Sequence, residues 1–153
     1  MGKRYQVAKV LIRVLLSSDT HFLMSRKRAP GSPNDDRLEF LGGRLDAGET
    51  VSSALLRELK EEETTGTLAN LAAGSDLASC EKITGDAHQH LFGMTIDANC
   101  VDQLIASEES HGFVVVPATE LQPGDRFTRK TNMILHSLAE DDPLGLLRFE
   151  VAE

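Results

Sequence analysis

The chain has 153 residues, of which 41% are hydrophobic and 26% are charged, a length and composition typical of a globular domain and not of a disordered or fibrous chain. We therefore expect a single domain over residues 1–153. The formal net charge of −8 argues against general electrostatic binding of nucleic acid polymers or anionic membranes. A small phosphorylated ligand, held locally, is compatible with it.

The two cysteines and the first apolar run bear on the cellular compartment in which the protein is expected. Cys80 and Cys100 are too few for a disulfide framework and lack the spacing of a zinc site, so they are typical of free thiols in a reducing environment. The apolar run of residues 7–16 is interrupted by Lys9 and Arg13, which argues against a signal peptide. We expect a cytoplasmic protein that does not associate with membranes.

The first third of the chain predicts short strands. Apolar residues occupy the even positions of residues 8–16, with Lys9 and Arg13 at odd positions, which predicts a strand with one buried face. Turn residues at 17–20 and an apolar run at 21–24 predict a hairpin. A loop follows at residues 29–36, and then a short strand at 37–41 that stops at Gly42 and Gly43.

Residues 48–63 predict a helix that buries an apolar stripe and ends at Gly66. Residues 68–80 are ambiguous, whereas 88–96 and 113–116 predict strands. A last helix is expected from about residue 125 to about residue 138. The apolar stripe of the first helix consists of Val51, Ala54, Leu55 and Leu59, and that of the last helix of Phe127, Met133, Ile134 and Leu138.

Charge is distributed unevenly along the chain. Residues 1–45 carry a net charge of +5, residues 46–63 carry −4, and residues 64–153 carry −9. A basic segment beside an acidic helix suits a polyanion bridged by metal ions, although surface charge also segregates without any catalytic role.

Three carboxylates share one face at the end of the first helix. Glu58, Glu61 and Glu62 fall within an arc of about 100° at the helical period, and their mutual repulsion costs about 0.2 to 0.5 kcal/mol per pair. A hard divalent cation such as Mg²⁺ or Mn²⁺ would offset this repulsion. Alternatively, the acidic end is solvent-exposed and partly paired, because Arg57 and Glu61 are spaced i,i+4.

The residues before this helix add a specific motif. Residues 43–62 read G-x5-E-x7-R-E-L-x-E-E, which resembles the Nudix box, G-x5-E-x7-R-E-U-x-E-E-x-G-U with U a bulky aliphatic residue. Six specified polar or glycine positions match in register. Where the family has its last glycine and aliphatic residue, this chain has Thr64 and Thr65, with Gly66 displaced by two positions, so the helix is expected to end later.

The resemblance implies an α/β fold, a Nudix-type α/β/α sandwich with a mixed sheet. It also implies an enzyme, a pyrophosphohydrolase that uses Mg²⁺, or Mn²⁺, to hydrolyse a nucleoside diphosphate linked to a group X. By correspondence with the family, Glu58, Glu61 and Glu62 would be metal ligands or would position the attacking water, and the Gly42 carbonyl would be a further metal ligand. Arg57 would orient the carboxylates, and Glu49 would support the loop before the helix.

Other candidate site residues lie outside the box. Many relatives supply a further glutamate, as ligand or general base, from a loop before a late strand, and Glu108 and Glu109 occupy that place here. Either one is equally compatible with an ordinary solvated loop. The basic segment offers Arg26, Arg28 and Arg44 as phosphate-binding residues, although an ordinary basic loop also explains them.

Histidines and one asparagine carry weaker signals. His88 and His90 alternate onto one side of an expected strand, but no third soft ligand is spaced near them, so we interpret them as structural or surface residues. Asn132 resembles an asparagine with which some relatives that cleave nucleoside triphosphates read the base. An exposed helical asparagine is the simpler interpretation.

The group X is the least determined feature. A proline about fifteen residues beyond the box marks many ADP-ribose hydrolases, and a nearby tyrosine marks many dinucleoside polyphosphate hydrolases; both are missing here. This favours a (deoxy)nucleoside triphosphate, with a nucleotide sugar or an ADP-ribose-type substrate as alternatives. A catalytically silent nucleotide sensor is the alternative from another class, and a homodimer is compatible with so small a domain.

Overall fold

The alternation of apolar residues near the N-terminus produces a long central strand, β1 (Tyr5–Leu16), in a computed structural model that describes residues 4–16 and 19–147. β1 pairs in parallel with β6 (Ala87–Asp97) and antiparallel with β2 (Asp19–Lys27) and β4 (Leu41–Arg44). Beyond these strands, β3 (Leu38–Glu39) and β7 (Ser110–Pro117) pair with β2, and β5 (Ser79–Thr84) pairs with β6. The result is a mixed sheet.

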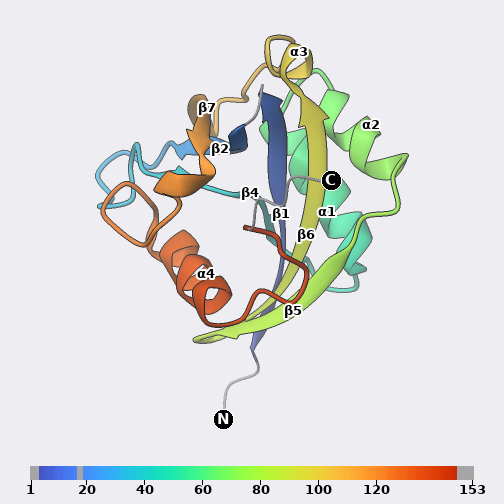
Figure 1. Cartoon of the computed structure of the whole chain (residues 1–153). Helices are drawn as coiled ribbons and strands as arrows, with labels where there is room; N and C mark the ends of the chain where they lie inside the picture. The colour runs from blue at the N-terminus through green and yellow to red at the C-terminus, as the bar shows by residue number, and fades with distance from the viewer. Residues whose placement is uncertain (1–3, 17–18, 148–153) are drawn as a thin grey trace.

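Helices cover both faces of this sheet (Figure 1). On one side lie α1 (Val51–Glu62) and α2 (Thr67–Ala73), and on the other lies α4 (Arg129–Glu140). The one-turn helix α3 (Ala98–Val101) follows β6, and a short 3₁₀ helix, η1 (Ala118–Glu120), follows β7. The expected α/β/α sandwich with a mixed sheet is confirmed. Within the described ranges, no helix has the length and apolar character needed to cross a membrane.

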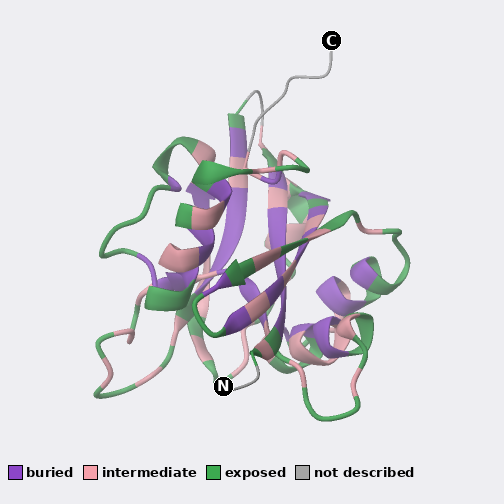
Figure 2. Ribbon diagram, turned by 90° about the horizontal axis from the view of Figure 1, so that it is seen from below, coloured by how far each residue is buried: buried purple, intermediate pink, exposed green. Residues whose placement is uncertain are grey.

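Two hydrophobic cores hold these layers together, one on each face. Val10, Leu55 and Leu59 belong to the core under α1 and α2, whereas Leu11 and Ile134 belong to the core under α4. Buried residues concentrate in the central strands between these layers (Figure 2). The prediction of one buried face for the first strand was therefore wrong, because α4 covers the second face, where Leu11 lies. Lys9, on the same face, is buried against the β3–β4 segment, where its ammonium donates to the carbonyl oxygens of Phe40 and Gly42.

One edge of β1 is shared between two partners. Residues 7–10 pair with β4, whereas residues 12–16 pair with β2. The sheet therefore divides along this edge, and polar side chains of β1, β2 and β4 face the cavity described below.

The bounds of several elements differ from expectation. The short strand continues through Gly42 and Gly43 as β4, because both glycines pair with β1. The main helix begins at Val51, since the Thr50 hydroxyl caps the N–H of Ser53 at 3.1 Å. The ambiguous residues after the main helix form α2 and the start of β5. The last helix begins only at Arg129, after its own threonine cap. Residues 17 and 18 of the expected turn lie outside the described residues.

Candidate functional site

Glycine at position 42 lets β4 lie close to β1, and glycine at position 43 lets the acidic helix approach β4. A Cβ on Gly42 would lie 2.1 Å from the backbone oxygen of Ala8, and the φ of Gly42 is +123°. A Cβ on Gly43 would lie 2.5 Å from the carboxyl carbon of Glu58. The missing side chain of Gly43 therefore forms the space that the Glu58 carboxylate fills.

Glu58 and Glu62 are one helical turn apart on α1, and both face the same cavity. The backbone N–H of Gly42 donates a hydrogen bond to Glu62 at 3.1 Å. Burial raises the pKa of Glu62 to about 8, although the Lys9 ammonium and the Gly42 N–H act in the opposite direction. Burial also raises the pKa of Glu58, against the effect of Arg57. Both carboxylates therefore lie where a cation would stabilise their charged forms.

Arg57 connects most of the acidic residues. Its guanidinium donates two hydrogen bonds to Glu49, at 2.8 and 2.9 Å, and others to Glu58 at 3.0 Å and Glu61 at 3.2 Å. It also donates to the carbonyl oxygen of Arg44 at 3.0 Å. The hydrogen bonds from Arg57 lower the pKa of Glu49 to about 2. Arg57 thus fixes the helix to the loop before it and orients two carboxylates.

Lys9 is a site residue that the sequence analysis missed. Its ammonium donates to the carbonyl oxygens of Phe40 at 3.1 Å and Gly42 at 3.0 Å, and lies 4.0 Å from Glu39. Only 8% of Lys9 is exposed. The available signal for a buried lysine was its position within the apolar run of residues 7–16, but strand alternation alone suggested that Lys9 lies on an exposed face.

Glu58 and Glu62 border a cavity of about 380 Å³ between the divided halves of the sheet. On its wall, Arg44 and Lys130 lie over the Tyr5 ring, with the Arg44 Cζ atom 4.3 Å and the Lys130 Nζ atom 5.5 Å from the ring centroid. Further polar lining residues are Lys9, Ser25, Lys27, Arg28, Glu39, Gln89, Glu109 and Ser110.

Gln89 adds an acceptor to this wall. Its side-chain nitrogen donates to Thr84 at 3.2 Å, whereas its buried Oε1 atom has no hydrogen-bond partner among the residues described. A buried acceptor of this kind is costly unless a ligand or water satisfies it. The cavity thus combines carboxylates, several cations and one free acceptor.

The structure brings some predicted residues to this cavity and places others elsewhere. Gly42, Glu58, Glu62, Arg28, Arg44 and Glu109 line it. Glu61 lies instead in a shallow surface depression beside Arg57. The backbone carbonyl of Glu108 accepts a hydrogen bond from Arg28 at 3.4 Å, and the side chain of Arg26 pairs with Asp36 at 3.3 Å.

The amide of Asn132 is occupied by a loop. Its Oδ1 accepts from the N–H of Gly124 at 2.9 Å, and its Nδ2 donates to the carbonyls of Gly124 and Phe127 at 2.9 and 3.3 Å. Asn132 therefore fixes the segment that precedes α4.

The end of the box differs from the sequence expectation. Helix α1 ends at Glu62, and Gly66, at a φ of +79°, is the residue that precedes α2 as its N-cap, so the prediction that Gly66 stops the first helix was wrong. The backbone at Thr64 does not take the left-handed conformation, and its N–H donates to the carbonyl of Ile105 at 2.9 Å. A threonine is therefore compatible with this position.

The comparisons with known proteins agree with this geometry. A family model described as the NUDIX domain matches residues 6–136, a range that contains α1 and most of the cavity lining. No curated protein matches the chain significantly.

Solved structures share the fold at low sequence identity. The Ap4A hydrolase of C. elegans is 14% identical, with a TM-score of 0.60 over 89% of this chain and 96% of that chain. The MutT protein of Methanosarcina mazei Go1 is 14% identical, with a TM-score of 0.61 over 94% and 99%. A bifunctional NMN adenylyltransferase/ADP ribose pyrophosphatase of Francisella tularensis is 21% identical, with a TM-score of 0.61 over 92% of this chain and 42% of that chain. At these identities the likeness establishes the fold.

Proposed function

The chain belongs to the NUDIX domain family, and on that premise we propose that it is a Mg²⁺-dependent pyrophosphohydrolase acting on a nucleoside triphosphate. One observation carries the proposal: Glu58 and Glu62 lie together at a cavity that also contains several cationic side chains. Carboxylates of this kind bind hard cations, and lysine or arginine binds phosphate oxygens. The cavity therefore combines metal-binding carboxylates with phosphate-binding cations, and hydrolysis of a polyphosphate needs both.

The donor set fits Mg²⁺. Glu58 and Glu62 offer carboxylate oxygens, and the missing Cβ of Gly43 leaves room for the Glu58 carboxylate. The Gly42 carbonyl, the other expected ligand, accepts a hydrogen bond from Lys9 at 3.0 Å. Glu61 would be a further ligand; without metal, Arg57 holds it at 3.2 Å. When bound, Mg²⁺ would neutralise phosphate charge and lower the pKa of a water molecule.

The protein's own groups would position the substrate. Lys27, Arg28, Arg44 and Lys130 surround the cavity and would hold phosphate oxygens. Arg57 would keep the metal-binding carboxylates in place through its bonds to Glu49 and Glu58. These contacts would hold the phosphate chain still while water attacks it.

Glu109 is our candidate for the general base. It lines the cavity together with Glu58 and Glu62, whereas Glu108 interacts with Arg28 through its backbone carbonyl. A carboxylate at this wall would accept the proton of the attacking water.

Two observations favour a substrate with a single nucleoside. A volume of about 380 Å³ is near the small end of ligand cavities. The free Oε1 of Gln89 needs a donor, which the base or sugar of a nucleoside would supply.

The test is phosphate release, coupled to pyrophosphatase or phosphatase, from nucleoside triphosphates, nucleotide sugars, ADP-ribose and dinucleoside polyphosphates, with and without Mg²⁺. We expect metal-dependent cleavage of nucleoside triphosphates. Preferred cleavage of another class would contradict the substrate and retain the enzyme. Tight nucleotide binding without turnover in Mg²⁺ or Mn²⁺ would identify a sensor instead.

A further inference from the structure

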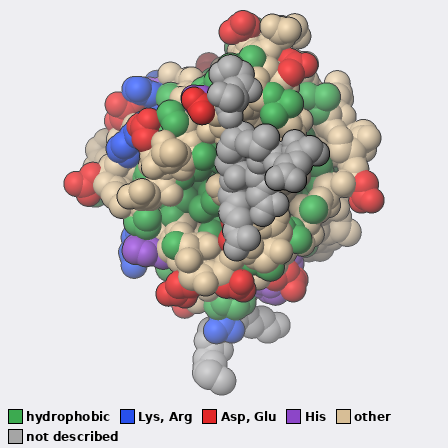
Figure 3. All heavy atoms as spheres, viewed as in Figure 1, with side chains coloured by type: hydrophobic (Ala, Val, Ile, Leu, Met, Phe, Trp, Pro, Cys, Tyr) green, Lys and Arg blue, Asp and Glu red, His purple; other side chains and the backbone are tan. Residues whose placement is uncertain are grey.

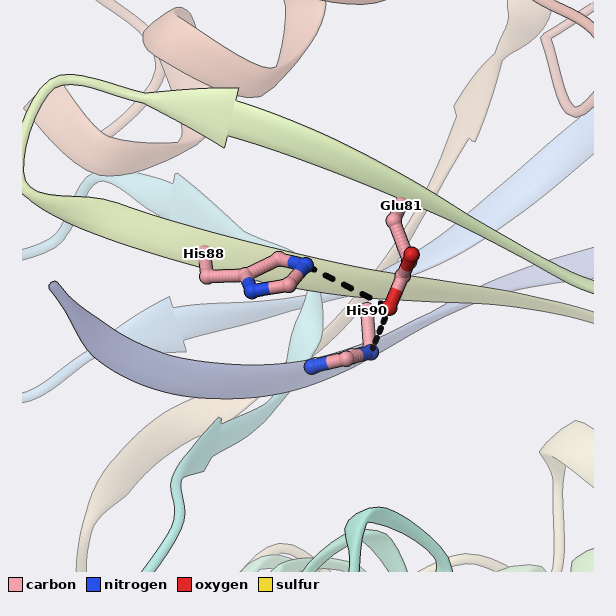
Figure 4. Close-up of side chains that lie close together, drawn as sticks. All are labelled: Glu81, His88 and His90. Carbon is pink, nitrogen blue, oxygen red and sulfur yellow. Dashed lines mark ion pairs between the residues drawn. The ribbon is translucent and has the colours of Figure 1, made fainter.

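A second group of metal-ligating side chains lies on the hairpin formed by β5 and β6. Glu81 comes from β5, and His88 and His90 come from β6 (Figure 4). One ligand atom from each residue lies within 4.8 Å of the others. We call these three residues the histidine cluster; the proposed reaction does not use them.

The pleat of β6 separates the histidine cluster from the cavity. Successive side chains of a strand point to opposite faces, so His88 and His90 lie on one face and Gln89 on the other. Gln89 lines the cavity, whereas the histidine cluster faces away from it. Any ion bound by the histidine cluster is therefore distinct from one bound by Glu58 and Glu62.

The third ligand comes from the strand pairing. Glu81 is the direct cross-strand partner of His90, and the two histidines are two residues apart on the same strand. The sequence offered no soft third ligand nearby, but antiparallel pairing of β5 with β6 brings a carboxylate there. The two imidazole rings stack at a centroid distance of 4.5 Å.

The spacing of the donor atoms suits one zinc ion. Oε1 of Glu81 lies 3.3 Å from Nε2 of His88 and 3.4 Å from Nδ1 of His90. Two donors bound to one tetrahedral Zn²⁺, each at about 2.1 Å, lie about 3.4 Å apart. Small rotations would bring all three donors around one ion.

Gln6 fixes the orientation of one histidine. Nε2 of His90 lies 2.5 Å from the side-chain oxygen of Gln6, on the adjacent strand β1. An amide oxygen only accepts, so this contact suits a neutral ring with its hydrogen on Nε2, which leaves the Nδ1 lone pair toward Glu81 for a metal ion or a second proton. A hydrogen bond on the far nitrogen is the usual support of a metal-binding histidine.

We propose that Glu81, His88 and His90 bind one Zn²⁺ ion, with water as the fourth ligand. Two imidazoles and a carboxylate are a donor set for zinc rather than for Mg²⁺, which takes oxygen ligands. The ion would join β5, at one end of the main strand order, to β6. It would therefore stabilise the outer hairpin of the sheet.

Titration of the full-length, tag-free and chelator-treated chain with ZnCl₂ in a calorimeter tests this proposal. We expect one Zn²⁺ per chain, with binding at least about 10-fold weaker in Glu81→Gln, His88→Gln or His90→Gln. Gln6→Ala should weaken binding by about 10-fold, as for other groups that support a ligand. Co²⁺ bound in place of Zn²⁺ should show the visible bands of tetrahedral coordination in the wild type and lose them in His90→Gln.

Two variants serve as controls. His136→Gln removes an exposed histidine of α4, and Glu62→Gln alters the acidic cavity; both should bind Zn²⁺ as the wild type does. Absence of Zn²⁺ binding, or unchanged binding in the three variants of the histidine cluster, would overturn the proposal. Loss of binding in Glu62→Gln alone would assign the zinc to the acidic cavity and overturn it equally.

Discussion

At the scale of single residues, Glu62 and Glu63 illustrate how the surroundings set the chemistry of a carboxylate. Glu62 faces the cavity, and burial raises its pKa to about 8. Glu63 is fully buried, and burial also acts to raise its pKa. However, hydrogen bonds from Thr65 and from the backbone N–H groups of Ile105 and Leu68 lower the pKa of Glu63 overall. One carboxylate is available to a cation, and its neighbour is a structural anion.

Removing a metal-binding charge should abolish most activity. We expect Glu62→Gln and Glu61→Gln each to lower turnover by about 10²-fold or more, because each change removes a charge that would place the metal. Steady-state phosphate release measures this effect. Glu140→Gln, the same change at an exposed position of α4, is the matched control and should retain wild-type turnover.

The pH dependence of the free energy of unfolding tests the raised pKa of Glu62. The raised pKa means that the folded state keeps a proton that the unfolded state loses, so metal-free wild type loses stability as pH rises from about 4.5 to about 8. Glu62→Gln should show a smaller loss, because only Glu58, whose pKa burial also raises, still contributes it. Wild-type turnover in both Glu61→Gln and Glu62→Gln would contradict the metal site that we propose.

At the scale of elements, Glu63 joins the end of α1 to the segment before β7. Its carboxylate accepts hydrogen bonds from the N–H groups of Thr65 and Thr67 at 2.9 and 3.0 Å, and of Ile105 at 3.1 Å. Glu63 therefore holds the chain directly after the end of α1, where the family motif has a glycine and an aliphatic residue at positions 64 and 65. The two threonines that depart from the box are part of this arrangement, through the Thr65 hydroxyl at 2.7 Å from Glu63 and the Thr64 N–H bound to Ile105.

Glu63→Gln should destabilise the protein by about 2 to 4 kcal/mol at pH 7, because it replaces a charged acceptor among buried donors. The lowered pKa makes this stabilisation complete above about pH 4.5 and progressively lost as pH falls. Urea denaturation at pH 7 and pH 3, with Glu140→Gln as control, measures both effects. A difference from wild type that is equal at the two pH values would contradict the assignment of charge.

At the scale of the whole molecule, the site joins distant parts of the chain. Glu58 and Glu62 come from α1, Lys9 from β1, Lys27 from β2 and Lys130 from α4. The two glutamates are acidic and the three lysines are basic, although the molecule as a whole has a net negative charge. Figure 3 shows acidic side chains at several places around one face, with few lysine or arginine side chains among them. The cavity thus offers local positive charge to a substrate, although the side chains on the face shown in Figure 3 include many acidic ones.

Binding of Mg²⁺ should therefore stabilise the whole fold. At about 100 times the dissociation constant, a bound ion adds about 2.7 kcal/mol to the free energy of unfolding, which corresponds to a rise in Tm of about 5 to 10 °C for a domain of this size. Thermal unfolding with MgCl₂, against NaCl at equal ionic strength, measures the shift. Glu62→Gln should show a much smaller rise; an equal rise in this variant would place the ion elsewhere.

Features that depend on local patterns could be predicted from the amino-acid sequence. Alternation predicted β1, the helical period predicted α1 with its buried Leu55 and Leu59, and the spacing from Gly43 to Glu62 identified the family. These signals are local because a strand, a helix and a motif each repeat or recur over a few neighbouring residues.

Which side chains contact one another could not be predicted without the folded structure. The burial of Lys9 depends on the packing of the β3–β4 segment against β1, and the approach of Glu81 to His90 depends on the register of β5 against β6. The choice of Glu109 rather than Glu108 at the cavity depends on how the loop before β7 packs. Such contacts join residues far apart in the chain, so their distances follow from strand register and layer packing, which local periodicity does not specify.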